Sequence, residues 1–237
     1  MTGKRPRSRR ASARGAALAY RMLPAFVTAL AALATSACGN KLPAIEAVEW
    51  RLESRPAPVG PPYESLSVFA SVKDDDGIDD ILEIWVLKDD SAYAWKFTDT
   101  DWIKATDGGD DWIGASAIAT PELASMPRGT YRFVAIDAAG QRAEKDFEVT
   151  GGFPDRKAPS LSCAGGILTI DSTWPETLAL AFDAAGTLLA SPGAPEGPSS
   201  LAGAFGSDLA ARTVQVGAYG YDPALKMGAF SDRVKAR

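Results

Sequence analysis

The 237-residue chain contains no histidine and only two cysteines, Cys38 and Cys163. Without an imidazole it offers no Ser-His-Asp or Cys-His arrangement, no histidine zinc ligand and no histidine-based pH switch. These absences exclude most hydrolases, and we predict that the protein is not an enzyme. Carboxylate pairs could support glycoside hydrolysis, but 30 acidic residues make chance pairs unavoidable and single out none.

The first 37 residues lack acidic side chains, although they carry seven of the 25 lysines and arginines. An apolar run from Leu23 to Cys38 follows this basic segment. A basic head, a short apolar run and small residues before a cleavage point are typical of a secretory signal peptide. The run is too short to cross a hydrocarbon core of ~30 Å comfortably as a helix. We therefore assign residues 1–37 to a signal peptide.

The end of this run, Ala37-Cys38-Gly39, resembles the lipobox of bacterial lipoproteins. The resemblance implies that Cys38 is acylated on sulfur and becomes the new N-terminus, so that its lipid anchors the exported chain in the cell envelope. Thr35 stands where the family usually has leucine, as in the looser motif that spirochaetes use. No aspartate follows Cys38, which on this resemblance favours the outer membrane, on its periplasmic or surface face. An ordinary signal peptide cut near Ala37 is the alternative.

Removal of residues 1–37 leaves 18 basic against 30 acidic residues, a net charge of −12. This surplus of acid argues against nucleic acid as a partner and against electrostatic docking on anionic lipid. The expected partners are the membrane, through the lipid on Cys38, and an unidentified protein or glycan. Once Cys38 is acylated, no intramolecular disulfide can form, and Cys163 is interpreted as a buried small apolar residue.

Residues 38–43 form a lipidated tether, and residues 44–150 read as a succession of short strands. Alternating apolar residues predict strands at 48–52, 66–72 and 93–97, with a further short strand at 112–113. Residues 81–87 are nearly all apolar, which predicts a strand buried on both faces. About seven strands in about 105 residues, without helical periodicity, predict an antiparallel β-sandwich.

The clearest element is a hairpin whose strands flank the turn Asp137–Gly140. Gly129–Phe133 leading into this turn resembles the closing hairpin of immunoglobulin-like and fibronectin type III-like modules. In those families a tyrosine forms a corner, which implies that the hydroxyl of Tyr131 bonds back to the upstream turn. The acidic turn Asp74–Ile78 before an apolar strand is similar to the same modules. The resemblance spans most of residues 44–150 and implies a fold, not a function.

Residues 151–159 have the composition of a linker, and residues 160–237 are expected to form a second, smaller β module of fibronectin type III-like character. Its expected strands lie at 167–171, 178–182, 188–189 and 214–218, before a last hairpin at 219–231. The tetrapeptide Asp183–Gly186 repeats Asp137–Gly140 and indicates two related modules. The predicted fold class is therefore all-β.

The segment Asp74–Asp80 has the carboxylate density and the glycine of a calcium loop. It lacks the ligand spacing of an EF-hand, although Asp110 or Asp111 could complete a site in a β-sandwich. We interpret it as a solvated acidic turn, because Asp-Gly pairs are common at tight turns, and expect no cofactor. A calcium site is the alternative.

Four tryptophans, Trp85, Trp95, Trp102 and Trp112, fall within 28 residues. Trp85 lies in an apolar strand and is expected in the core. Trp102 and Trp112 lie beside aspartates and are expected to face water, where they could form a platform for a sugar.

These features together predict a membrane-anchored envelope lipoprotein with a non-catalytic binding or structural role. Two alternatives remain open: a carbohydrate-binding module that uses its exposed tryptophans, and a calcium-stabilised adhesin.

Overall fold

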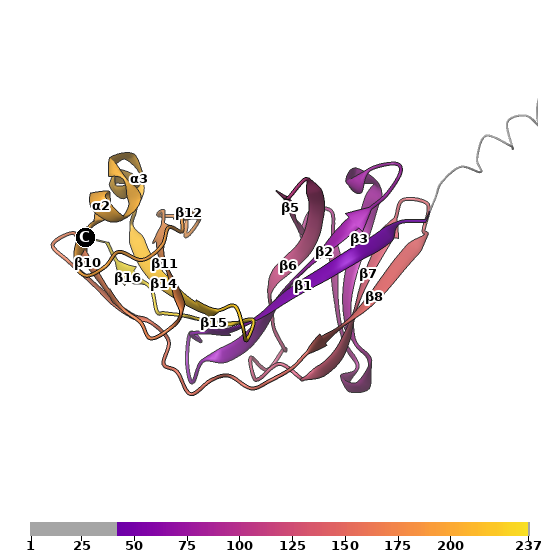
Figure 1. Cartoon of the computed structure of the whole chain (residues 1–237), viewed down its shortest axis with the longest axis horizontal. Helices are drawn as coiled ribbons and strands as arrows, with labels where there is room; N and C mark the ends of the chain where they lie inside the picture. Colours follow the sequence, from indigo (N-terminus) through magenta and orange to yellow (C-terminus); the bar gives the residue numbers. More distant parts are fainter. Residues whose placement is uncertain (1–41, 237) are drawn as a thin grey trace, which may run out of the picture. The chain divides into compact units, whose positions relative to one another are not determined.

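The computed structural model describes residues 42–236, so Cys38 and the predicted signal peptide lie outside the described residues (Figure 1). The described chain is all-β, which confirms the predicted fold class. Its strands are β1 (Ala44–Arg55), β2 (Tyr63–Lys73), β3 (Ile81–Lys88), β4 (Tyr93–Thr98), β5 (Ile103–Asp107), β6 (Asp110–Ile118), β7 (Gly129–Asp137), β8 (Arg142–Val149), β9 (Ser160–Ala164), β10 (Ile167–Asp171), β11 (Glu176–Phe182), β12 (Leu188–Ala190), β13 (Ser199–Ser200), β14 (Gln215–Asp222), β15 (Met227–Phe230) and β16 (Val234–Lys235). Two short helices, α2 (Leu201–Phe205) and α3 (Ser207–Arg212), lie between β13 and β14.

These strands form three sheets. The long sheet has the order β12-β11-β14-β15-β1-β2-β6-β5, with β16 beside β14. A four-stranded sheet has the order β4-β3-β7-β8, and a three-stranded sheet the order β13-β10-β9. Among the described strands every pairing is antiparallel except that of β1 with β15.

The sandwich, strands β1–β8, holds the larger core. Apolar residues on alternate positions of β1, β2 and β6 face those of β3 and β7, because successive side chains of a strand point to opposite faces. The shared core includes Leu52, Leu66, Val68, Ile84, Val86, Ile113 and Phe133, each with no exposed surface. Removing this apolar area from water is the main source of the sandwich's stability, at ~25 cal/mol per Å².

Two predictions about strand β3 were wrong: that it is buried on both faces and that Trp85 lies in the core. It is buried on one face only: alternate residues from Ile84 to Lys88 are buried and those between them are partly exposed. The register shift between Ile81 and Glu83 in its pairing with β7 decides which set faces the core. Trp85 therefore lies half-buried on the face away from the core, where its Nε1–H donates to Glu83 Oε2 at 3.1 Å. The Lys96 ammonium sits 5.3 Å from its ring centroid.

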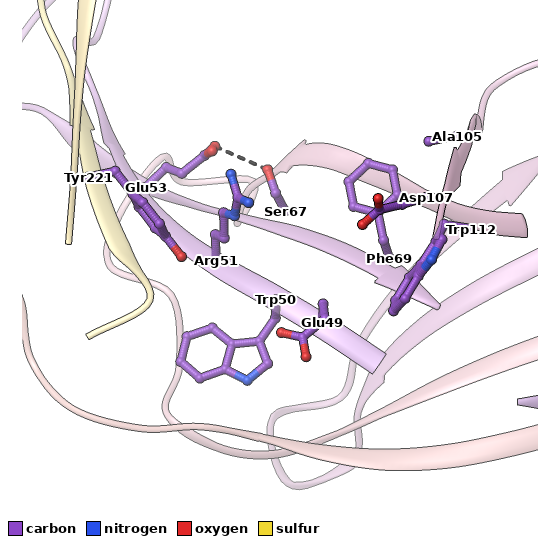
Figure 2. Close-up of a pocket in the computed structure, with 10 residues that line it drawn as sticks. All are labelled: Glu49, Trp50, Arg51, Glu53, Ser67, Phe69, Ala105, Asp107, Trp112 and Tyr221. Atoms are coloured by element: carbon purple, nitrogen blue, oxygen red, sulfur yellow. Dashed lines mark hydrogen bonds between the residues drawn. The ribbon is translucent and has the colours of Figure 1, made fainter. Parts of the chain in front are cut away.

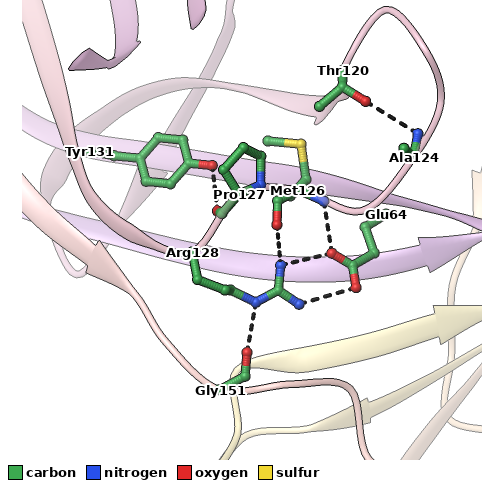
Figure 3. A network of polar contacts seen from close by, with 8 residues as sticks. All are labelled: Glu64, Thr120, Ala124, Met126, Pro127, Arg128, Tyr131 and Gly151. Carbon is green, nitrogen blue, oxygen red and sulfur yellow. Dashed lines mark hydrogen bonds and ion pairs between the residues drawn. The ribbon is translucent and has the colours of Figure 1, made fainter. Parts of the chain in front are cut away.

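The hairpin β7–β8 forms as predicted, and Tyr131 makes the corner that the family resemblance implied (Figure 3). Its ring is 1% exposed, and its hydroxyl donates to the Pro127 carbonyl oxygen at 2.7 Å. Burial raises the pKa of this phenol, since the charged form would lose its hydration.

A second contact in Figure 3 fixes the long connection between β6 and β7. The Arg128 guanidinium donates to both carboxylate oxygens of Glu64 on β2, at 2.7 Å to Oε2 and 3.0 Å to Oε1. Its Nε–H donates to the Gly151 carbonyl at 2.6 Å, and Glu64 Oε2 accepts the Met126 amide at 2.8 Å. This forked pair ties one end of the sandwich to the start of the predicted linker.

The C-terminal region, strands β9–β16, has a smaller core. Helices α2 and α3 cover Leu168, Ala179, Ala181 and Val216, all of which lack exposed surface. The Ser200 hydroxyl caps α2 by accepting the Gly203 amide at 3.0 Å. The predicted strands at 167–171 and 178–182 are confirmed, whereas β5, β9, β13, β16 and both helices were not predicted.

The two Asp-Ala-Ala-Gly segments fold into matching turns. Asp137 Oδ1 accepts the Gln141 amide at 2.7 Å, and Asp183 Oδ1 accepts the Thr187 amide at 2.8 Å. Gly140 and Gly186 have φ of 78° and 81°, a conformation that favours glycine. The repeated tetrapeptide thus specifies the same local structure twice.

Strand β15 runs parallel to β1, with Leu52 opposite Met227, so that the long sheet continues from the sandwich into the C-terminal region. Residues 151–159 carry no strand, in keeping with their linker composition. The division into modules at 44–150 and 160–237 stays a prediction. None of the helices within residues 42–236 has both the length and the apolar character that a membrane span requires.

Candidate functional site

The acidic turn before β3 brings together three carboxylates. Asp74, Asp80 and Asp137 each offer an oxygen, and the three oxygens lie within 4.8 Å of one another. Asp74 precedes the short 3₁₀ turn Ile78–Asp80 (η2) and Asp80 is its last residue, whereas Asp137 ends β7. The backbone joins these segments, because the Ala138 amide donates to the Asp80 carbonyl at 2.9 Å.

Asp137, and not Asp110 or Asp111, completes the trio, so the structure does not support the two carboxylates named for the calcium alternative. Asp110 instead pairs with Lys73 at 3.0 Å, and Asp111 accepts the Thr106 hydroxyl at 3.2 Å, both on the β5–β6 side of the long sheet. The sequence did not reveal Asp137 as a candidate, because its position depends on the pairing of distant strands. Strands β3 and β7 are antiparallel neighbours, so the acidic turn before β3 lies beside Asp137 at the end of β7.

The trio fits a hard cation in part. Oxygens that ligate one Ca²⁺ at 2.3–2.6 Å lie at most about 5 Å apart, as these do. Asp74 Oδ2 is buried and has no hydrogen-bond partner among the described residues, whereas Asp74 Oδ1 accepts the Asp76 amide at 2.9 Å. Calcium takes six to eight oxygens, so backbone carbonyls or water would complete the shell.

The tryptophans do not form one surface. Trp95 and Trp102 are half-buried and pack against the sandwich core. Trp112, on β6, lines a cleft on the other face of the long sheet. Of the pair expected to face water, only Trp112 therefore reaches a site where a ligand could lie.

That cleft lies on the face of the long sheet opposite the sandwich core, because its lining residues Arg51, Phe69 and Trp112 each precede a core residue or follow one along their strands. We call this face the outer face, and Figure 2 shows the residues that line the cleft. It measures about 590 Å³, within the range of ligand pockets. Figure 2 shows Tyr221 on one side and the rings of Phe69 and Trp112 on the other, with the Arg51 side chain between them. The lining residues are Glu49, Trp50, Arg51, Glu53, Ser67, Phe69, Ala105, Asp107, Trp112 and Tyr221.

The strand registers explain why these side chains meet. Arg51 pairs with Ser67 and Glu49 with Phe69 across β1 and β2, and residues opposite each other in a ladder share a face. Phe69 in turn stands opposite Gly114 of β6, where a Cβ would lie 2.8 Å from its ring. The glycine therefore lets the phenyl ring lie across the strand.

Two of the lining residues, Glu53 and Ser67, belong to a largely buried polar network. Glu53 is 6% exposed, and its Oε2 accepts the Arg55 guanidinium at 2.6 Å and the Ser67 hydroxyl at 3.1 Å. Arg55 Nε–H also donates to Ser65 Oγ at 2.7 Å. These bonds compensate for the desolvation of the carboxylate and hold it in place.

Three arginines stack on aromatic rings of the outer face. Arg51 lies 4.8 Å from the ring centroid of Tyr221, Arg55 4.3 Å from Phe230 and Arg233 3.6 Å from Phe182. The second and third pairs border a further hollow of about 400 Å³. Stacking against a ring fixes each guanidinium while leaving its N–H donors accessible from the side.

Tyr219 lies beside the cleft and is 5% exposed. Its hydroxyl is buried and has no hydrogen-bond partner among the described residues. It rests on Gly228, where a Cβ would come within 2.3 Å of it. Burial, followed by the nearby Glu53 carboxylate, raises the pKa of this phenol.

Of the two cysteines, Cys38 lies outside the described residues. Cys163 is half-buried against the smaller core, and its Sγ–H donates to the Ala236 carbonyl at 3.2 Å. Burial raises the pKa of this thiol, which disfavours the reactive thiolate. Cys163 thus packs against a core as predicted, but it is half-buried and not buried.

Comparisons with known proteins add the following. No protein-family model matches the chain, and no curated protein matches it. Among solved structures, Tp47, the 47-kilodalton lipoprotein of Treponema pallidum, is 15% identical with a TM-score of 0.38 over 81% of this chain and 50% of its own. Latent PorU of Porphyromonas gingivalis is 14% identical with a TM-score of 0.31, over 82% and 20%. A chimeric titin Z1Z2 tandem is 16% identical with a TM-score of 0.24, over 81% and 97%. The chain thus spans half the length of Tp47, and at these scores none of the three bears on function.

Proposed function

We propose that the protein is a lipid-anchored envelope protein whose all-β body has a non-catalytic role in binding or structural support. The observation that carries the proposal is the apolar run ending at Cys38, followed by a strongly acidic chain that folds as strands. Acylation of Cys38 would hold the body at the membrane, since each buried CH₂ of the acyl chains adds ~0.8 kcal/mol. On the family resemblance the membrane is the outer one.

The test is Cys38→Ala, with Cys163→Ala as the matched control because it removes the other thiol. We expect that the wild type and the control incorporate radiolabelled palmitate and sediment with membranes, whereas Cys38→Ala does neither. If Cys38→Ala stays membrane-bound, the proposed anchor is wrong.

A second candidate, a calcium-stabilised adhesin, is favoured by the carboxylate trio and by Asp74 Oδ2, which is buried without a hydrogen-bond partner within residues 42–236. Calcium at 100 times its Kd would stabilise the fold by ~2.7 kcal/mol, which raises the melting temperature by several degrees. Differential scanning calorimetry with calcium and then with chelator measures this shift. Asp137→Asn should abolish it, and Asp76→Asn, in the same turn but outside the trio, should retain it. Equal melting temperatures with calcium and with chelator would leave a plain acidic turn.

A further inference from the structure

We propose that the cleft on the outer face binds a neutral oligosaccharide, stacked between Tyr221 on one side and Trp112 with Phe69 on the other. This inference rests on the proposed non-catalytic binding role and names the class of ligand. The sequence suggested Trp102 and Trp112 as the sugar-binding surface. Of these two residues, only Trp112 lines the cleft proposed here.

The aromatic walls suit a sugar ring. The faces of a pyranose carry C–H groups that pack against aromatic rings, while its hydroxyls project around the edge. Tyr and Trp offer such flat surfaces at little cost in conformational entropy, and each carries one polar group for the rim. Phe69 and Trp112 stand on adjacent strands on the same side of the cleft, so one ligand can contact both rings (Figure 2).

The space between the walls offers donors and acceptors at fixed positions. Arg51 presents guanidinium N–H groups and is held against Tyr221 at 4.8 Å. The carboxylates of Glu49 and Asp107 accept hydrogen bonds from hydroxyls, as does Ser67 Oγ, whose own proton goes to Glu53. Because stacking holds Arg51 and pairing holds Glu49 and Ser67 in advance, a ligand would not have to order these three groups.

The charges of the cleft balance, which favours an uncharged ligand. Its three lining carboxylates are Glu49, Glu53 and Asp107, and the cations beside them are Arg51 in the lining, Arg55 on Glu53 at 2.6 Å and Lys226 on Glu49 at 2.8 Å. The formal charges sum to zero. An anionic or cationic partner would gain little here from complementary charge, whereas a polyhydroxyl ligand uses both signs as hydrogen-bond partners.

The width of the cleft favours a chain of sugars over a single ring. Tyr221 belongs to β14 and Trp112 to β6, which are four strand-to-strand steps apart in the long sheet. At ~4.8 Å per step the two strands lie about 19 Å apart across the sheet, and the registers align Trp112 with Ala47 and Tyr221 with Glu53, which separates them further along β1. A ligand that contacts both walls is therefore an oligosaccharide.

The experiment titrates the full chain, purified in a detergent without a sugar headgroup, with neutral hexasaccharides of glucose, xylose, mannose and N-acetylglucosamine. Calorimetry gives affinities that do not depend on the tryptophans as reporters. We expect saturable binding of at least one hexasaccharide. Trp112→Ala and Tyr221→Ala should each weaken it at least tenfold, and Trp112→Phe, which keeps a flat ring, should weaken it less. The control Trp85→Ala removes a half-buried tryptophan of the other sheet and should leave the affinity unchanged.

Salt separates neutral from charged ligands, since an affinity that rests on stacking and hydrogen bonds changes less than twofold between about 50 and 500 mM salt. A flat titration across the panel overturns the proposal, as does binding that survives Trp112→Ala. Binding of tetralysine or of a polyuronic hexasaccharide in place of the neutral sugars also overturns it. Cys38→Ala should retain the affinity, so failure of the anchor and failure of the sugar site give different results.

Discussion

The sandwich and the C-terminal region differ in the size of their hydrophobic cores. Twenty buried residues form the sandwich core, and they include large rings such as Phe133 and Tyr131. The main core of the C-terminal region has eight, of which Ala179, Ala181 and Ala210 are typical in size. Small side chains bury little area, so the C-terminal region gains less from the hydrophobic effect. Met227, on β15 of the C-terminal region, is buried in the sandwich core. We therefore infer that the stability of the C-terminal region depends on the sandwich.

The largest expected effect is that of Phe133→Ala, which removes a ring with no exposed surface and should cost ~3–5 kcal/mol of unfolding free energy. Phe205→Ala should cost less, because Phe205 lies in the short helix α2, which can relax around the gap. Urea unfolding measures both. Equal losses would contradict the comparison of the two cores.

Met227→Ala should cost ~2–5 kcal/mol and loosen the C-terminal region selectively, since it removes that region's anchor in the sandwich core. Hydrogen exchange should quicken in β14 and β15 while β3 and β7 stay protected. The control is Met126→Ala, a core methionine of the sandwich that is 2% exposed. If both variants expose β14 and β15 equally, the two regions unfold as one unit.

High pH should weaken both regions. Burial raises the pKa of Tyr131 and of Tyr219, so the folded chain keeps protons that the unfolded chain loses from about pH 10. This stability is fully present below about pH 10 and falls above it, by up to ~1.4 kcal/mol per pH unit for each phenol. Urea unfolding at about pH 9 and pH 11 tests this, with Tyr131→Phe and Tyr219→Phe as controls that should each lose one tyrosine's share of the slope.

The smallest effect separates the same two tyrosines at neutral pH. Tyr131→Phe removes the bond to Pro127 and leaves that carbonyl without it, so it should cost ~1 kcal/mol. Tyr219→Phe removes a buried hydroxyl that has no hydrogen-bond partner in the described part of the chain, so it should be neutral or slightly stabilising. A matching loss in Tyr219→Phe would indicate a partner for its hydroxyl, such as bound water.

Local patterns predicted much of this fold, because alternation and turn chemistry act over a few residues. The hairpin at Tyr131, the turn at Asp183 and the strands of β1 and β2 all follow from such patterns. The failures are of another kind. Trp85 points outward because of one register shift in the pairing with β7, and Asp137 joins the acidic turn through strand neighbours far apart in sequence.

The cleft shows the same limit. Alternation along β1 places Glu49, Arg51 and Glu53 on one face, which could be read from the sequence. Tyr221 comes to that face through the parallel pairing of β1 with β15, which no local signal announces. The sequence therefore predicted most of the strands but not their order in the sheet.

The parallel pairing of β1 with β15 also affects the order in which the strands can fold. Leu52 and Met227 are 175 positions apart, so β1 must wait for a partner strand that emerges from synthesis or export long after it. Closing so large a loop is slow, and until it closes β1 has one bare edge to which another chain can pair. A nascent or clipped chain without β15 should therefore be the form most prone to aggregate and most in need of a chaperone during export.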